Sequence, residues 1–590
     1  MAPTLLQAPA VQPERPVVGR PSASRLARGL PLIALAIVLV GGFWIRAPLI
    51  AYNLPVAAHV DERNSIDLLL HLKRESLDPG FFNYPTLYFY LNWFVLQPAE
   101  SAEEMLRVGR TLNLLLACGA GLAAFCFGAL VLRSRWTGVA AAALTVFSPI
   151  LVNSASYIIT DVFFAALATA AVAALGSFFA RGGYRAWCVG VVCMGLATAT
   201  KYNAAVAVVA YLLAEFACPP VAGTSAPGRT RASWRAWLEG RWRRGAIAGV
   251  ALCLGAVGLL TGVFFPESLL LELVESGQGL NSRVDPSDLR FLEGIRSKVL
   301  VAGIGACGLA AACWRWPALE RRLACRRPYA GGALAVAVFF ACSPFVALSF
   351  RQFLFDFGYE LKMNSAGAEA HWAHYPRWFA QSESPLVGAL ALAGAAACWL
   401  RRRRESLVAI LYLLLFYVLI GSATRGFERY LTPMLPILFV FAAYGLLDIA
   451  ERLRRGLGGG VAAMFGVGVV AVVGFGQQPR VSEVTARAGT RDEMYGSYRA
   501  TLGVVGDGTV HYAGHVPYLE LREHGVPVHE LPYARLAEPD LDRLLVSGDV
   551  LLMDRRALEC MSDENRGRLT ELHAESVGWG QHLFAAHPRP

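Results

Sequence analysis

An adjacent pair of carboxylates, Asp61 and Glu62, follows the first long apolar segment of the chain. Acidic residues close to a membrane are costly to place near lipid, so this pair is a candidate for chemistry. A positioned Asp or Glu can act as a general base and take the proton of a reacting hydroxyl. The alternative is an aqueous loop with two ordinary carboxylates, and the residues that follow along the chain decide between the two.

Four more polar residues stand at the boundaries of later apolar segments. Asp161 opens one segment, where a lone Asp often caps a helix. Lys201 follows the end of another, where a lysine often extends to the membrane interface. Arg425 and Arg429 lie in a late loop and are either solvated charges or candidates for binding phosphate. An arginine offers a planar fork for phosphate and a lysine a compact point charge.

The composition indicates a membrane protein. The 590-residue chain is 55% hydrophobic and only 17% charged, with a mean hydropathy of +0.44, whereas a soluble protein carries about a quarter charged residues. The net charge of +10 comes from short arginine clusters between apolar segments, which predicts no nucleic-acid partner. Most of the twelve cysteines lie inside apolar segments, so no disulfide framework is expected.

Apolar stretches of roughly 17–25 residues predict about 13 transmembrane helices. They centre on residues 30–45, 108–132, 137–153, 162–180, 186–200, 203–217, 245–265, 298–314, 329–349, 385–400, 406–422, 431–449 and 458–475. The arginine clusters occupy alternate loops, at 133–135, 181–185, 229–244, 315–327, 401–404 and 452–455. This pattern predicts that these loops and the N-terminus are cytoplasmic, and that the other loops and the C-terminal tail are extracytoplasmic.

Three parts are therefore expected: a disordered cytoplasmic leader (1–29), a transmembrane domain (30–475) whose first outer loop is 48–106, and a soluble extracytoplasmic tail (476–590). The predicted fold class is mainly α, with a small α/β domain in the tail. Strands are predicted there by alternating runs at 509–513, 526–531 and 549–553, and a helix at 538–545.

The first outer loop contains two short apolar stretches. An amphipathic run, 66–72, suits a helix in the plane of the interface. After Asn83-Tyr84-Pro85, the aromatic run 87–96 is too short for a comfortable span. We interpret the aromatic residues of this run as interfacial anchors, namely Tyr88, Phe89, Tyr90 and Trp93.

The order of these motifs resembles that of the GT-C glycosyltransferases of the protein-mannosyltransferase and aminoarabinose-transferase group. The motifs are Asp-Glu in the first outer loop, Tyr-Pro, Ser-x-x-x-x-x-x-Asp, Gly-Leu-Ala-x-x-x-Lys-Tyr, and a late Arg-Tyr-Leu-x-Pro-x-x-Pro. The likeness covers residues 30 to about 475, and the tail matches no motif. A His-Pro-Pro-type element, found in some protein mannosyltransferases, is absent, which argues against a protein acceptor.

This resemblance implies an inner-membrane enzyme that transfers a sugar from a polyprenyl-phosphate donor to a glycan, lipid or protein acceptor on the outer face. It implies that Asp61 is the base, with Asp161 beside it, and that Glu62 lines the site. The substrate-binding residues that it implies are Tyr84, Lys201, Tyr202, Arg425, Arg429 and Tyr430, with Lys201 and Arg429 as the candidates for the phosphate.

No cofactor or metal site is predicted. The pairs His371/His374 and His511/His515 lack a nearby third ligand, which zinc sites require, and a divalent metal is left open without a pattern that indicates one. Two other classes of function remain: a secondary transporter and a non-catalytic scaffold of a cell-envelope glycan assembly. A transporter is expected to carry ionisable residues near the bilayer midplane, whereas the charges here gather at one face.

Overall fold

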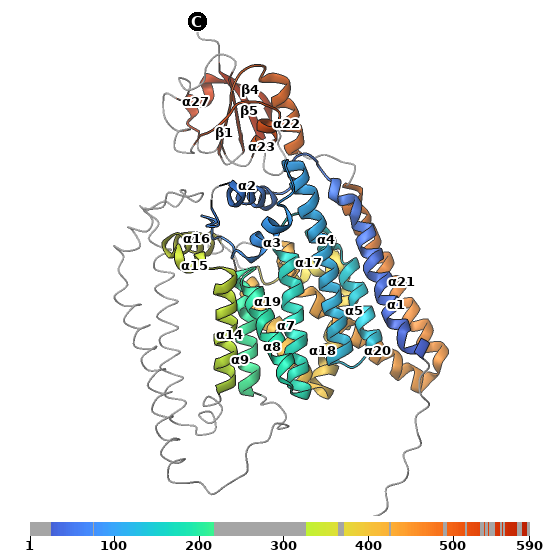
Figure 1. Ribbon diagram of the computed structural model, residues 1–590. Coiled ribbons are helices and arrows are strands. Elements are labelled where there is room, and N and C mark those ends of the chain that lie inside the picture. The colour runs from blue at the N-terminus through green and yellow to red at the C-terminus, as the bar shows by residue number, and fades with distance from the viewer. Residues whose placement is uncertain are drawn as a thin grey trace, which may run out of the picture.

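The computed structural model describes residues 25–217 and 326–586, apart from residue 75, stretches at 364–370, 424–425, 488–492 and 514–515, and several between 532 and 580. The helices form a bundle, and a smaller domain that contains a sheet lies at one end of it (Figure 1). The predicted spans 245–265 and 298–314 and most of the predicted leader lie outside the described residues.

The bundle is built from long helices with short connections. They are α1 (Arg25–Arg46), α4 (Ala102–Cys126), α5 (Arg135–Phe147), α7 (Asp161–Arg181), α8 (Tyr184–Thr198), α9 (Val206–Ala217), α14 (Arg326–Cys342), α18 (Pro385–Arg401), α19 (Arg403–Gly421), α20 (Leu435–Leu457) and α21 (Gly459–Ala486). Shorter helices are α2 (Val60–Arg74), α3 (Leu87–Val95), α6 (Pro149–Ala155), α15 (Phe345–Leu348), α16 (Phe350–Met363) and α17 (His374–Glu383). Short 3-10 or π segments are Ala47–Ala51, Phe127–Val131, Tyr202–Ala205 and Glu428–Leu431.

Several of the described helices have the length and composition of membrane spans. Five of them are long and apolar enough to cross a membrane, or seven when each of two bent pairs counts as one span. The chain is therefore a mainly helical protein of membrane type, as predicted.

Two sharp bends occur in the bundle, and the first of them interrupts an expected span. The predicted span 137–153 is two helices, α5 and α6, which meet at 57°. Pro149 opens α6, where its missing N–H costs no hydrogen bond, and the Ser148 hydroxyl caps the new helix. The second bend, of 111°, separates α17 from α18. The buried carboxylate of Glu383 stands at this bend and accepts hydrogen bonds from the Ser148 hydroxyl and the Ile150 N–H, so it joins the two bends.

Small residues allow a close helix contact in the bundle. Gly394 of α18 faces Gly445 of α20, and a Cβ on Gly394 would lie 1.8 Å from the carbonyl oxygen of Phe441. Close backbone approach of this kind is typical of helix pairs in membranes.

The first outer loop departs from its prediction in two respects. Helix α2 begins at Val60, so the acidic pair lies in its first turn instead of in a loop before it. Tyr88 and Phe89 of α3 are buried against the rest of the outer loop, and the Tyr88 hydroxyl donates to Asn113. The interpretation of these two residues as interfacial anchors was therefore wrong, because their side chains are used for packing inside the protein.

The tail contains a five-stranded sheet of order β2-β1-β3-β5-β4. Strands β1, β2 and β3 are parallel, and β5 runs antiparallel to both of its neighbours. The elements are α22 (Glu493–Val504), β1 (Val510–Ala513), α23 (Tyr518–Glu523), β2 (Val528–Glu530), β3 (Val550–Asp554), α27 (Asp563–Arg568), β4 (Leu569–Ala574) and β5 (Gln581–Ala586). Strands β1 and β2 lie within the alternating runs of the sequence, and β3 ends one residue after the third run. Most of the predicted helix 538–545 is outside the described residues.

Candidate functional site

Four charged side chains from distant segments meet at the end of the bundle that carries the tail. The Lys201 ammonium lies 2.5 Å from Asp161 Oδ1, and Arg429 Nη2 lies 2.7 Å from Asp61 Oδ2. Arg429 Nε lies 3.9 Å from Asp161 Oδ2 and so links the two pairs. Two carboxylates and two cations thus form one cluster, which we call the charged cluster.

Local helix geometry explains why these residue types stand at these positions. Asp61 and Asp161 lie in the first turns of α2 and α7, where free backbone N–H groups favour a negative charge. Lys201 follows the end of α8, where free carbonyl groups favour a positive charge. The ends of three elements therefore bring complementary charges to one place.

Aromatic rings frame the two cations. The Lys201 ammonium lies 5.6 Å from the ring centre of Tyr84 and 5.2 Å from that of Tyr430, and Arg429 lies 5.1 Å from that of Phe427. Such contacts stabilise a cation that has lost part of its water. Burial raises the pKa of the Tyr84 phenol well above its usual value, so the hydroxyl stays protonated and can donate a hydrogen bond.

The two carboxylates of the charged cluster differ in access. The Asp161 side chain is 3% exposed, whereas that of Asp61 is 22% exposed. A small pocket also opens beside Asp61 and extends along the next turn of α2. It is lined by Asp61, Asn64, Ser65, Phe81, Tyr84, Phe89, Ile159 and Thr160. Asp61 is therefore the carboxylate that an entering molecule can reach.

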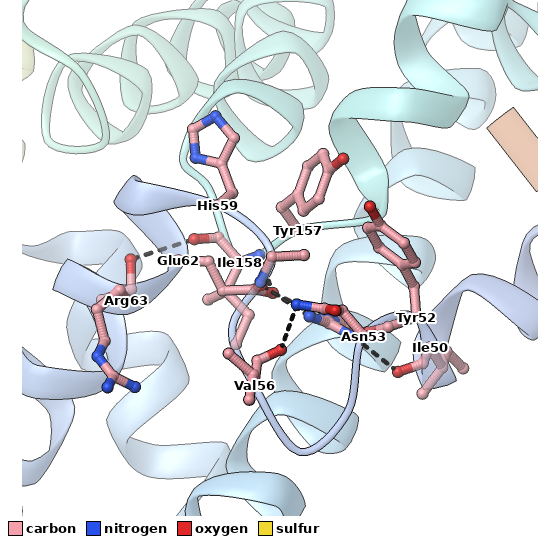
Figure 2. Close-up of polar contacts among 12 residues, drawn as sticks. Ile50, Tyr52, Asn53, Val56, His59, Glu62, Arg63, Tyr157 and Ile158 are labelled. Atoms are coloured by element: carbon pink, nitrogen blue, oxygen red, sulfur yellow. Dashed lines mark hydrogen bonds and ion pairs between the residues drawn. The ribbon is translucent and has the colours of Figure 1, made fainter. Parts of the chain in front are cut away.

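Glu62 occupies a different place from its neighbour. Its carboxylate has no exposed surface and makes two hydrogen bonds with Arg110 of α4, at 2.8 and 2.7 Å. It also accepts from the N–H groups of Ala58 and Ile158, and Figure 2 shows it directed toward Ile158. This geometry assigns Glu62 to the support of the site, where it holds α2, α4 and the start of the loop before α7 together.

The other predicted residues either contact the charged cluster or support the structure around it. Tyr430 lies beside the charged cluster, where its ring contacts Lys201. The Tyr202 hydroxyl donates to the carbonyl of Phe82, and its ring packs against Phe357 of α16, so it supports the aromatic segment behind the cluster. Arg425 lies outside the described residues.

His59 is a residue of the site that sequence reasoning missed. Its Nδ1 faces the Asp61 N–H at 3.1 Å, and its Nε2 faces Arg429 Nη1 at 2.8 Å. Its ring also packs against Tyr157, and both rings are visible in Figure 2. Burial lowers the pKa of His59 and favours the neutral ring.

A neutral imidazole accepts a hydrogen bond at only one of its nitrogens. His59 faces two donors, so it cannot satisfy both of them at the same time. Moving Arg429 onto another anion would relieve this mismatch. The only signal in the sequence was a histidine two residues before Asp61.

The charged cluster is not arranged as a metal site. Within the described residues, no three His, Cys, Asp or Glu side chains are placed to hold a metal ion. His371 and His374 pack against each other, with ring centres 4.8 Å apart, and against Trp378.

Comparison with known proteins supports the fold. No protein-family model and no curated protein sequence matches the chain. Solved structures do match over nearly its whole length. The archaeal oligosaccharyltransferase AglB from Archaeoglobus fulgidus, in complex with an inhibitory peptide and a dolichol-phosphate, is 12% identical with a TM-score of 0.53, over 96% of this chain and 75% of that one.

The second similar structure is ArnT from Cupriavidus metallidurans. In the apo state it is 13% identical with a TM-score of 0.53, over 96% of this chain and all (100%) of that one. Bound to undecaprenyl phosphate it is 13% identical with a TM-score of 0.51, over 95% of this chain. The chain therefore has the fold of the GT-C glycosyltransferases, as the order of its motifs predicted.

Proposed function

We propose that this protein transfers a sugar from a polyprenyl-phosphate donor to an acceptor hydroxyl at the end of the bundle that carries the tail. Fold alone does not determine function, so the proposal rests on the charged cluster of Asp61, Asp161, Lys201 and Arg429. The similar structures of AglB and ArnT, which hold a dolichol-phosphate and undecaprenyl phosphate, support a lipid-phosphate donor.

The two cations are suited to the phosphate of the donor. Arg429 Nε is buried and has no hydrogen-bond partner among the described residues, while the side chain as a whole is 17% exposed. One donor of the guanidinium is therefore unused, and a ligand reaches it when the side chains around Arg429 shift. Lys201 adds a point charge that is 11% exposed. In the transfer, the bond between the sugar C1 and the phosphate oxygen breaks, and these cations stabilise the charge that develops on the departing phosphate.

Asp61 is suited to the acceptor side of the same step. As the acceptor oxygen bonds to C1, its proton passes to the Asp61 carboxylate, which is a general-base role. Asp61 has the exposed surface that this role needs and a small pocket beside it, whereas Asp161 is nearly buried against Lys201. We therefore assign the role of general base to Asp61. Asp161 instead holds Lys201 in position.

The arginine clusters support an extracytoplasmic site. Helix α7 begins and α8 ends at the charged cluster, so the connection between them, at Gly182 and Gly183, lies at the far end of the bundle. Arg181 and Arg185 flank this connection. Because basic loops remain in the cytoplasm, we place the far end there, and the site and the tail outside the inner membrane.

Removing either cation should weaken binding of the donor. We expect Arg429→Ala and Lys201→Ala each to raise the Kd for a labelled polyprenyl phosphate about 10- to 100-fold, since a hydrogen bond to a charged group contributes roughly 1.5–3 kcal/mol. Arg429→Lys should restore little, because an ammonium lacks the planar fork. The measurement is equilibrium binding to the purified protein.

Arg107→Ala is the matched control, because Arg107 is a half-exposed arginine on α4 whose partner is Glu103. It should bind the lipid like the wild type. Unchanged affinity in both site variants would show that the charged cluster does not hold the phosphate.

A further inference from the structure

Three consecutive charged residues of α2 contact three different parts of the molecule. Successive residues of an α-helix point about 100° apart, so Asp61, Glu62 and Arg63 face in three directions. Asp61 pairs with Arg429 of the late loop, Glu62 with α4, and Arg63 with the tail. The orientation of α2, and with it the position of Asp61, is therefore set from three sides.

The contact with the tail is a buried ion pair. Arg63 donates to both carboxylate oxygens of Glu520, each at 2.6 Å, and the two side chains are 2% and 1% exposed. Arg63 Nη2 also donates to the carbonyl of Val516 at 3.0 Å, and the guanidinium lies 4.8 Å from the ring centre of Tyr518. Figure 2 shows the Arg63 side chain pointing away from His59 and Tyr157.

Apolar and capping contacts surround this ion pair. Val56, from the segment before α2, is fully buried in a cluster made otherwise of tail residues, among them Tyr512. Leu519 of the tail is buried in turn among outer-loop residues such as Ile66. The Glu523 carboxylate accepts the first N–H of α4 at 2.7 Å. The tail and the first outer loop therefore each bury a side chain of the other, and these contacts hold the tail against α2 and α4.

We propose that Glu520 is a positioning residue for the transfer reaction, which acts on Asp61 through Arg63 and α2. This inference rests on the proposed function of the charged cluster and makes the tail domain a required part of the site. A buried charge that loses its partner is strongly unfavourable. Without Glu520, the polar contacts of the Arg63 guanidinium among the described residues are the Val516 carbonyl and the more distant Asp67 carboxylate, 4.0 Å from its Nε, so we expect α2 to shift. A displacement of about 1 Å in a catalytic group can cost on the order of 10²-fold in rate.

The test compares Glu520→Ala, Glu520→Gln and the control Asp507→Ala, which removes an exposed carboxylate of the tail. Three quantities are measured on the purified full-length protein: kcat for transfer, Kd for polyprenyl phosphate, and hydrogen exchange of residues 57–66. We expect both Glu520 variants to lose about 10- to 100-fold in kcat, with Kd within about twofold of the wild type. Exchange in 57–66 should become faster, and Asp507→Ala should match the wild type.

Glu520→Gln keeps the size of the side chain, so it remains informative if Glu520→Ala fails to fold. Wild-type kcat in the Glu520 variants would overturn the positioning role, whether or not exchange changes. If the wild-type protein transfers no sugar, the proposed function fails, and the exchange result then tests the structural part of this inference, the control of α2 by Glu520. Unchanged exchange in 57–66 would then refute it, and faster exchange would support the control of α2 by the tail.

Discussion

Asp61→Asn should reduce sugar transfer about 10²–10⁴-fold while the protein still folds and binds the donor lipid. An amide has nearly the same size as the carboxylate and still accepts the hydrogen bond from Arg429, but it cannot take up the acceptor proton. The partial exposure of Asp61 makes the loss of its charge tolerable for folding. The measurement is transfer from a labelled polyprenyl-phosphate sugar in reconstituted membranes.

Glu103→Gln is a suitable control, because it removes a carboxylate that is 40% exposed and pairs with Arg107 on the surface of α4. Its transfer rate should equal that of the wild type. If Asp61→Asn turned over at the wild-type rate, Asp61 would not be the base, and Asp161→Asn would be the next variant to measure.

Arg110→Ala should have the largest effect on stability. The Arg110 side chain is fully buried and donates to Glu62 and to the carbonyl groups of Ile50 and Tyr52. Removing one partner of a buried ion pair typically costs about 3–5 kcal/mol, because the other charge is left without compensation. We therefore expect a large loss of folded protein and a lower midpoint of heat inactivation in detergent.

The control for this variant is Arg107→Ala, on the same helix and 49% exposed. Exposed ion pairs contribute about 0–1 kcal/mol, so its midpoint should stay close to that of the wild type. An Arg110→Ala protein as stable as Arg107→Ala would mean that the contact between α2 and α4 is not essential for folding.

The membrane helices were predictable because the signal is local. An apolar run of spanning length identifies a helix without knowledge of its neighbours, and the predicted span 162–180 corresponds to α7 within a residue at each end. The bend inside the predicted span 137–153 was missed, although Pro149 opens a new helix there. Whether a chain bends before a proline depends on what packs there, in this case the carboxylate of Glu383.

The residues of the site were predictable in kind but not in their pairing. The order of short motifs pointed to Asp61, Asp161, Lys201 and Arg429, and the structure brings all four together. No local sequence pattern predicts that Lys201 pairs with Asp161, because this contact depends on how α7 and α8 pack. Glu62 has the same residue type and nearly the same position as Asp61, and only the rotation of α2 separates their roles.

The supporting residues were the least predictable. Arg110 lies inside the predicted span 108–132, and an arginine at such a position usually has a charged partner in the protein interior. This signal was overlooked, and the structure shows that Arg110 is buried. The partner of Arg63 is 457 residues away in a tail that matches no known motif. Long-range pairs of this kind are fixed by the tertiary structure and leave no periodic trace in the sequence.

The central claim, sugar transfer from a polyprenyl-phosphate donor, is tested most directly by comparing the lipids and glycans of cells with and without this protein. Cells that lack it should accumulate one polyprenyl-phosphate sugar and lose one glycan modification, and the wild-type gene should reverse both changes while Asp61→Asn should not. The accumulated lipid would also identify the sugar. Identical lipid and glycan profiles in the two cell lines would contradict the assignment of this protein as a transferase.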